Sequence, residues 1–340
     1  VLLWPTPAYL LLGVLVGYAV GVLPGLGAPA ALALILPATI SLSPTDSFVL
    51  LASVAAVSAM AGDITSILLG VPGEATSAAI VPDGHAMARR GQGAVAAGAA
   101  LTAAWFGAAI GALVLAVVLP VSRPLLGLCL VTALSRGNMR KGIAAGAFGI
   151  ALATIGLDPL LGEPRLTFGH TGLWDGPGLF PVALGIYAVP EALQMIRGVV
   201  PVKQAAGSSR RGLLEGCLST LRRPGLVARC GALGAAIGML PGVGATITQW
   251  LAYAYASQSK GSVRLGDGAI EGVIAPATTT TATLGGALIP TLFLGIPGSV
   301  TAAFLLGALT FKGLTPGPSL LVPDAAGGHL SLVWALVWCI

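Results

Sequence analysis

The feature that most constrains this chain is a set of long stretches without a charged side chain. Residues 1–45, 91–122, 230–259 and 272–311 contain no Asp, Glu, Lys or Arg. A transmembrane helix needs about 20 mostly apolar residues, and each stretch exceeds that length. The apolar runs are continuous and do not alternate with a period of two, which disfavours a membrane β-barrel. The sequence therefore predicts an all-α polytopic membrane protein.

The composition supports the same class. Charged residues make up 9% of the 340 residues and apolar residues 56%, whereas a soluble domain carries about 25% charged residues. So few charges cannot cover the surface of a soluble enzyme, and they exclude a disordered protein and a nucleic-acid binder. The predicted partner is the lipid bilayer, and the excess of Lys and Arg is typical of cytoplasmic loops.

Two glycine- and proline-rich motifs occur twice in the same order. Gly21-Val-Leu-Pro-Gly-Leu-Gly27 matches Gly238-Met-Leu-Pro-Gly-Val-Gly244, and Leu69-Gly-Val-Pro-Gly73 matches Leu294-Gly-Ile-Pro-Gly298. The motifs of a pair lie 49 residues apart in the first half and 57 in the second. We therefore expect a two-repeat bundle: residues 1–196 form the first membrane repeat with accessory helices, residues 197–229 a basic, cytoplasmic linker, and residues 230–340 the second, C-terminally incomplete repeat.

The motifs predict helix breaks inside the membrane. Proline removes a backbone N–H and blocks the preceding helical turn, and glycine tolerates a tight or left-handed backbone. The freed backbone groups must face protein or a water-filled cavity, and secondary transporters build substrate and ion sites at such breaks. A kink that only helps packing is the alternative for any single motif. The candidate site residues from the motifs are Pro24, Gly25, Gly27, Pro72, Gly73, Pro241, Gly242, Gly244, Pro297 and Gly298.

Two acidic residues lie near the first pair of motifs. Asp63 stands between apolar runs, and an ionisable group at membrane depth is a candidate functional residue. It could bind Na⁺, carry a proton, or act as the N-cap of the next helix. Glu74 follows Pro72 and Gly73 and precedes Ser77, so we expect it to support the first turn of the helix that begins there. A direct role at the substrate is the alternative, although Glu74 would repel an anionic substrate unless an ion lies between them. Gly62 and Ser66, beside Asp63, complete this group of candidates.

The second half offers hydroxyl groups in place of carboxylates. Thr278, Thr280 and Thr281 lie in an uncharged stretch, and Ser299 follows Pro297 and Gly298. These hydroxyls could coordinate Na⁺ or donate to a carboxylate; back-bonding to the carbonyl four residues earlier is the alternative for the threonines. No cofactor or metal site is expected apart from a coupling ion, Na⁺ or H⁺, with Na⁺ near Asp63 or Thr280.

The polar segment after the second motif carries Asp83, Arg89 and Arg90. We expect a polar turn between two membrane spans, in which the arginines set the topology. Asp83 would serve as a turn or cap residue.

These motifs resemble the large membrane subunit of the tripartite tricarboxylate transporters, the TctA family. The resemblance also rests on Asp83-Gly-His-Ala-Met-Ala-Arg-Arg-Gly91, Glu271-Gly-Val-Ile-Ala-Pro276, Gly285-Gly-Ala-Leu-Ile-Pro290 and Gly313-Leu-Thr-Pro-Gly-Pro318, and it adds Gly285 and Gly286 to the candidates. It implies a multi-pass permease of the bacterial inner membrane. Such a permease works with a periplasmic solute-binding protein and a small membrane subunit to take up small carboxylates of the tricarboxylate type, such as citrate, driven by an ion gradient. Because family members are longer, we expect the chain to be a fragment.

The sequence departs from the family pattern at four places. Ala61-Gly-Asp-Ile64 stands where the family has a Tyr-Gly-Gly-Ser-like stretch, and Gly70 replaces an Asn. Ala277 replaces a Glu, and Thr280 and Thr281 replace an Asn pair. The loss of a carboxylate and two amides puts the usual substrate or ion chemistry in doubt. The alternative function is an unrelated secondary carrier or a channel with internal repeats. An enzyme is not expected, because neither an HExxH motif nor a paired Ser and His is present.

Overall fold

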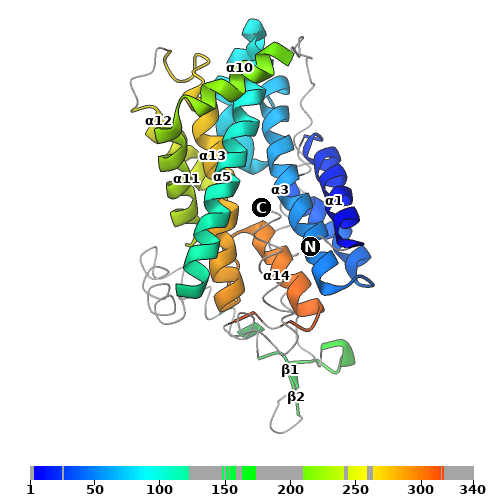
Figure 1. Ribbon diagram of the computed structural model, residues 1–340. Coiled ribbons are helices and arrows are strands. Elements are labelled where there is room, and N and C mark those ends of the chain that lie inside the picture. The colour runs from blue at the N-terminus through cyan, green and yellow to red at the C-terminus, as the bar shows by residue number, and fades with distance from the viewer. Residues whose placement is uncertain are drawn as a thin grey trace.

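The structure is a computed structural model that describes residues 4–24, 27–121, 148, 151–152, 154–157, 163–173, 210–240, 244–258, 263–314 and 316–317. Within these ranges, three helical segments are long and apolar enough to cross a membrane, namely Pro44–Leu69, Ala75–Val118 and Glu271–Leu294. The predicted class, an all-α polytopic membrane protein, is confirmed. Within the described residues, one short antiparallel strand pair, β1 (Gly156–Leu157) and β2 (Pro164–Arg165), lies outside the bundle (Figure 1).

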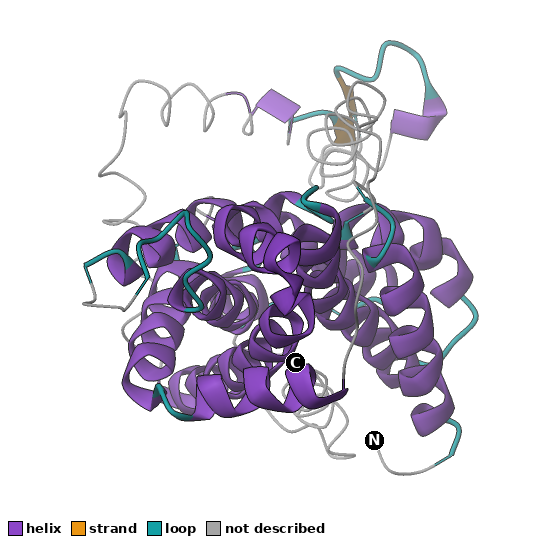
Figure 2. Cartoon of the chain, turned by 90° about the horizontal axis from the view of Figure 1, so that it is seen from above, coloured by secondary structure: helices purple, strands orange, loops and turns teal. Residues whose placement is uncertain are grey.

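The helices form one bundle, seen from above in Figure 2. The first half contains α1 (Thr6–Gly21), α2 (Ala28–Ile35), η1 (Leu36–Thr39), α3 (Pro44–Leu69), η2 (Ala75–Ile80), α4 (Val81–Met87), η3 (Ala88–Gln92) and α5 (Gly93–Val121). A short turn, η4 (Thr171–Leu173), follows the strand pair. The second half contains α10 (Arg210–Leu221), α11 (Pro224–Gly238), α12 (Gly244–Ala256), α13 (Glu271–Leu294) and α14 (Val300–Phe311).

Each glycine- and proline-rich motif lies between two helices, as predicted. The chain turns between α1 and α2, α3 and η2, α11 and α12, and α13 and α14. Helices α3 and α13 end in the same way, at Gly70 (φ 70°) and Gly295 (φ 69°), which adopt the left-handed conformation that glycine favours at a helix end. By contrast, Pro276 and Pro290 lie inside α13 without ending it. Pro276 and Pro290 lack the neighbouring glycines that accompany Pro24, Pro72 and Pro297.

Helices α3 and α13 run in opposite directions through the centre (Figure 1). One apolar cluster joins the beginning of α3, including Phe48 and Leu51, to the end of α13, including Leu292. A second cluster joins Ile67, near the end of α3, to Ile274, near the beginning of α13. The two clusters fix the antiparallel arrangement, because each brings the start of one helix against the end of the other.

Helices α1 and α11 pack on α3 and α13 through matching glycines. On α1, a Cβ atom at Gly17 would lie 2.8 Å from the Val54 backbone oxygen of α3, and a Cβ atom at Gly21 would lie 2.4 Å from the Ser58 backbone oxygen. On α11, Cβ atoms at Gly234 and Gly238 would each lie 2.5 Å from a backbone oxygen of α13, those of Thr279 and Thr283 respectively. Glycine is required here because the helices touch backbone to backbone, the contact that small residues permit in membranes.

Two segments differ from the sequence-based expectations. The linker expected over residues 197–229 is mostly helical where it is described, since α10 covers residues 210–221 and α11 begins at Pro224. Helix α10 packs closely on α5, where a Cβ atom at Gly216 would lie 2.1 Å from the Val95 oxygen. The polar turn expected around Asp83, Arg89 and Arg90 is wrong as well: residues 81–92 are helical and only kinked, at Gly91 (φ 78°).

Two ionisable side chains tie the halves together at opposite ends of the bundle. Asp83 of α4 is fully buried, and its Oδ1 accepts hydrogen bonds of 2.8 Å each from the backbone N–H groups of Gly266, Gly268 and Ala269. Tyr253 donates to its other oxygen at 2.8 Å. Lys312, just after α14, donates to three carbonyl oxygens between η1 and α3, those of Thr39, Ile40 and Leu42, at 2.8, 2.9 and 2.6 Å.

Candidate functional site

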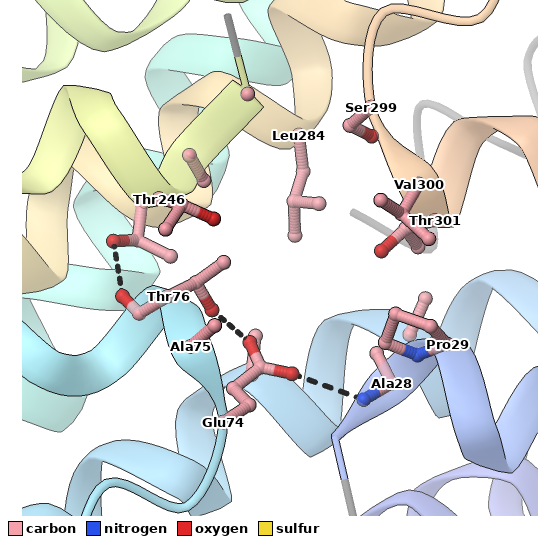
Figure 3. A pocket seen from close by; sticks show the side chains of 15 residues that line it. Ala28, Pro29, Glu74, Ala75, Thr76, Thr246, Leu284, Ser299, Val300 and Thr301 are labelled. Carbon is pink, nitrogen blue, oxygen red and sulfur yellow. Dashed lines mark hydrogen bonds between the residues drawn. The ribbon is translucent and has the colours of Figure 1, made fainter. Parts of the chain in front are cut away.

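The four helix breaks meet at one cavity of about 90 Å³. Each helix that follows a break begins at its wall: α2 with Ala28, η2 with Glu74 as its N-cap, α12 with Gly244, and α14 with Ser299 as its N-cap. Figure 3 shows these segments around the cavity. The remaining wall residues are Pro29, Ala55, Ala59, Ala75, Thr76, Ala245, Thr246, Thr280, Leu284, Val300 and Thr301. The beginning of a helix carries unpaired N–H groups and partial positive charge, which favours an anion.

The chain reaches the cavity after α3 and after α13 by the same local structure. After the left-handed glycine the backbone turns inward, and Gly73 packs against Gly62 while Gly298 packs against Ala287; a Cβ atom on either would lie within 2.7 Å of that backbone. Gly73 N–H then donates to the Ser66 hydroxyl at 3.4 Å. The small glycines therefore let an extended segment enter beside a long helix.

The second half repeats this hydrogen bond. Gly298 N–H donates to the Thr291 hydroxyl at 3.2 Å, and a shift of 225 positions relates Thr291 to Ser66 and Gly298 to Gly73. The same shift relates Ser299 to Glu74. Both residues are extended N-caps, with φ −150° at Ser299 and −144° at Glu74. The two halves therefore present different side chains, a hydroxyl and a carboxylate, at equivalent places in the cavity wall.

Glu74 bridges two breaks of the first half. Its Oε2 accepts a hydrogen bond of 3.0 Å from the backbone N–H of Ala28 at the start of α2, and Thr76 donates to Oε1 (Figure 3). Glu74 and Ser77 also form a reciprocal capping box at the start of η2. The expected support of a helix start by Glu74 is thus present, and Glu74 additionally occupies the start of a second helix.

Gln249 of α12 connects the second half to this region. It is fully buried; its Oε1 accepts from Ala79 N–H at 2.9 Å, and its Nε2 donates to the carbonyl oxygens of Ala75 at 2.6 Å and Thr246 at 3.1 Å. Thr280 of α13 donates to the Thr76 oxygen at 3.1 Å. These bonds hold the segment after the second break against the helices of the other half.

Asp63 is buried inside α3, with 2% of its surface exposed. The N-cap role is wrong for Asp63, because α3 runs uninterrupted from Pro44 to Leu69. Asp63 lies one turn beyond Ala59, which lines the cavity. Its Oδ1 has no hydrogen-bond partner among the described residues, and a buried unpaired carboxylate oxygen demands an explanation.

The predicted site residues fall into groups by position. Gly244, Thr280 and Ser299 line the cavity. A second set lies just behind the wall and shapes the chain there, namely Gly27, Gly62, Asp63, Ser66, Gly73, Ser77 and Gly298. Pro24, Pro72 and Pro297 lie in the turns themselves. Gly25, Pro241 and Gly242 lie outside the described residues.

Four predicted residues of α13 do not line the cavity. Thr281 donates to the Ala104 oxygen of α5 at 2.9 Å, and Thr278 back-bonds to Ile274 at 2.8 Å. Gly285 packs on Gly111 of α5, and Gly286 on Ala235 of α11. Of the two alternatives for the threonines, back-bonding describes Thr278 and Thr281, while Thr280 alone of the predicted three faces the cavity.

Several wall residues were missed by the sequence-based prediction. Thr76, Thr246 and Thr301 line the cavity, and each follows a break by a few residues. Ala55 and Ala59 also line it, from inside α3. The signal was available, because a helix that begins at a break must present its first turn there. Extending the candidates by one turn beyond each motif would have included the threonines.

The sequence matches the model of the Tripartite tricarboxylate transporter TctA family over residues 8–340. The chain belongs to this family. It is also 32% identical over 345 residues to an uncharacterized 52.8 kDa protein in the TAR-I ttuC' 3' region of Agrobacterium vitis, covering 96% of this chain. A second protein, from the TAR-II ttuC' 3' region of the same organism, is 34% identical over 105 residues, 31% of this chain. The chain spans 66% and 41% of these relatives. No solved structure matches it.

Proposed function

We propose that this chain is the membrane permease subunit of a binding-protein-dependent secondary transporter for small carboxylates. The observation that carries the proposal is the convergence of four helix starts on one cavity that residues of both halves line. Broken helices whose N-termini point at a shared cavity are the arrangement by which secondary transporters hold anionic substrates. Membership of a transporter family supports the same function and argues against catalysis.

The cavity supplies neutral hydrogen-bond donors for a carboxylate. Thr246, Ser299 and Thr301 contribute hydroxyls, and the starts of α12 and α14 contribute backbone N–H groups. The hydroxyl protons of Thr76 and Thr280 are already donated to Glu74 and to the Thr76 carbonyl oxygen. Among the described wall residues there is no Lys or Arg. A substrate bound by dipoles and hydroxyls is released more readily than one held by a buried ion pair, which suits a transport cycle.

The coupling ion, Na⁺ or H⁺, acts in this proposal at Asp63. The unpartnered Oδ1 of Asp63 lies behind the cavity wall, and the negative charge of Glu74 acts on the Asp63 carboxylate. Two buried carboxylates in one region attract a cation or a proton, because neither charge is solvated. Ion entry next to the substrate would thereby offset the charge of an arriving carboxylate.

The proposed surroundings follow from the family. The permease would span the bacterial inner membrane several times, together with a small membrane subunit, and would receive its substrate from a periplasmic solute-binding protein. The three long apolar helices and the tripartite character of the family support this assembly.

Uptake into proteoliposomes tests the function. The full-length protein is reconstituted with its small subunit, and uptake of radiolabelled carboxylates is measured with and without the binding protein and with imposed Na⁺ or H⁺ gradients. We expect saturable uptake that requires both the gradient and the binding protein. Uptake that does not saturate and needs neither would indicate the alternative, a channel.

The variant Asp63→Asn tests the ion site. We expect it to fold normally and to lose gradient-driven uptake, because the amide preserves the shape but has no negative charge to attract a cation and no proton to release. Asp267→Asn is the matched control, since Asp267 is exposed and does not line the cavity. Unchanged gradient dependence in Asp63→Asn would remove Asp63 from the mechanism.

A further inference from the structure

The two halves differ in chemistry at one pair of equivalent positions. Glu74 and Ser299 follow the same left-handed glycine, the same Pro-Gly pair and the same hydroxyl-to-backbone hydrogen bond. Both line the cavity, and both cap the helix that begins there. Because the backbone around the two positions is the same, the two halves differ here in side-chain chemistry alone: a carboxylate at Glu74 and a hydroxyl at Ser299.

The carboxylate of Glu74 already occupies the start of a helix. Its Oε2 accepts the Ala28 N–H at 3.0 Å, and the side chain is 8% exposed. The chain thus places its own carboxylate where α2 would otherwise offer N–H groups to a solute. Ala28 corresponds to Ala245 of α12 by the shift of 217 positions that relates Gly27 to Gly244.

The other side of the cavity is arranged differently. The Ser299 hydroxyl accepts the Ala302 N–H of its own helix at 3.1 Å, and among the described residues no hydrogen bond joins Ser299 to α12. The start of α12, with Gly244, Ala245 and Thr246, faces the cavity directly. On the wall that the second half forms, the start of α12 and nearby hydroxyl groups are therefore available to a ligand.

We propose that Glu74 is a specificity-determining residue that limits how many carboxylates a substrate can carry. This inference rests on the proposed function and narrows its substrate class. The substrate places one carboxylate against the starts of α12 and α14, and its other end, facing Glu74, is uncharged. Small monocarboxylates fit this cavity, whereas each additional carboxylate is repelled by Glu74. Replacing Glu74 shifts the preference toward higher charge.

Binding of a matched series of acids tests the inference. Butyrate, succinate and tricarballylate carry one, two and three carboxylates on short aliphatic chains. Their affinities for the full-length protein in nanodiscs are measured by calorimetry for wild type, Glu74→Gln and Glu74→Ser. Gln keeps an oxygen for Ala28 N–H and removes the charge; Ser reproduces the residue of the second half. Glu215→Gln, an exposed site on α10, is the matched control.

We expect the ratio of tricarballylate to butyrate affinity to rise at least about tenfold in Glu74→Gln, as removal of a like charge several ångströms away implies. The rise should be larger in Glu74→Ser, which also frees the start of α2, and absent in Glu215→Gln.

An unchanged ratio in both Glu74 variants, or an equal loss of affinity for all three acids, overturns the inference while leaving the proposed function standing. Absence of binding by all three acids to every protein overturns the proposed function and the inference with it. Thermal unfolding of each variant checks its folding, and a ratio shift in either folded variant suffices.

Discussion

The contact between α11 and α13 gives a sharp prediction, because one helix contains both a crowded and an uncrowded glycine. Gly234 of α11 faces the Thr279 oxygen, whereas a Cβ atom at Gly225 of the same helix would have nothing within 4 Å. The substitutions Gly234→Ala and Gly225→Ala add the same methyl group. They therefore separate the effect of packing from the general effect of replacing glycine in a helix.

The expected magnitude follows from the distances. The added Cβ at position 234 would lie 2.5 Å from the Thr279 oxygen, about 0.9 Å short of the 3.4 Å at which ordinary contact begins. Since the obstacle is backbone, α11 must move away from α13, and overpacking of this kind costs about 1–3 kcal/mol. Alanine gains up to about 1 kcal/mol over glycine in helix propensity, and this gain largely cancels between the two variants. We expect Gly234→Ala to be less stable than Gly225→Ala by about 1–3 kcal/mol.

The measurement is unfolding of the purified full-length protein in mixed micelles by added dodecyl sulfate, followed by circular dichroism. Gly17→Ala in the first half should behave like Gly234→Ala, because its Cβ would lie 2.8 Å from the Val54 oxygen. Equal stability of Gly234→Ala and Gly225→Ala, within about 0.5 kcal/mol, would refute the backbone-to-backbone packing inferred here.

Three further predictions concern charged side chains that join segments far apart in the chain. Asp83→Ala should lower the free energy of unfolding by about 3–5 kcal/mol, because buried donors lose a charged acceptor. Asp83→Asn keeps an oxygen as acceptor and should lower the free energy of unfolding by about half as much. Unfolding by dodecyl sulfate measures both variants. Lys312→Met preserves the aliphatic stem but removes three hydrogen bonds, so the free energy of unfolding should fall by about 1–3 kcal/mol. A cysteine introduced between residues 39 and 42 should also be labelled faster in this variant. An unchanged labelling rate would contradict the idea that Lys312 holds this segment in place. Arg223→Gln breaks the 2.9 Å pair with Glu271, whose arginine is one-third exposed, and should change stability by less than about 1 kcal/mol; a larger loss would show that the pair is more than a surface contact.

The positions of the helix breaks could be predicted from the sequence because their cause is local. A proline beside glycines removes a backbone donor and permits a left-handed turn, wherever the segment lies in the bundle. The same reasoning identified Glu74 as a helix cap. It could not show that the Glu74 carboxylate also reaches Ala28, since that contact joins residues 46 positions apart.

The roles of the threonines in α13 depended on tertiary structure. Thr278, Thr280 and Thr281 lie on neighbouring positions of one helix, and only the packing of α5 and η2 decides which hydroxyl meets the cavity. Similarly, the basic segment before α11 looked like a loop because of its charges. Its helix α10 is stabilised by a close glycine contact with α5 that no local pattern reveals.

The ties made by Asp83 and Lys312 have a consequence for how the protein is made. The hydrogen-bond donors to Asp83 lie 170 to 186 residues later in the chain. Lys312 donates to carbonyl oxygens that are synthesised 270 to 273 residues earlier. Neither end of the bundle can close until most of the chain has left the ribosome and entered the membrane. Two pieces separated between α5 and α10 should consequently assemble with each other when co-expressed, while the first piece alone would retain a buried Asp83 carboxylate without its donors and be degraded.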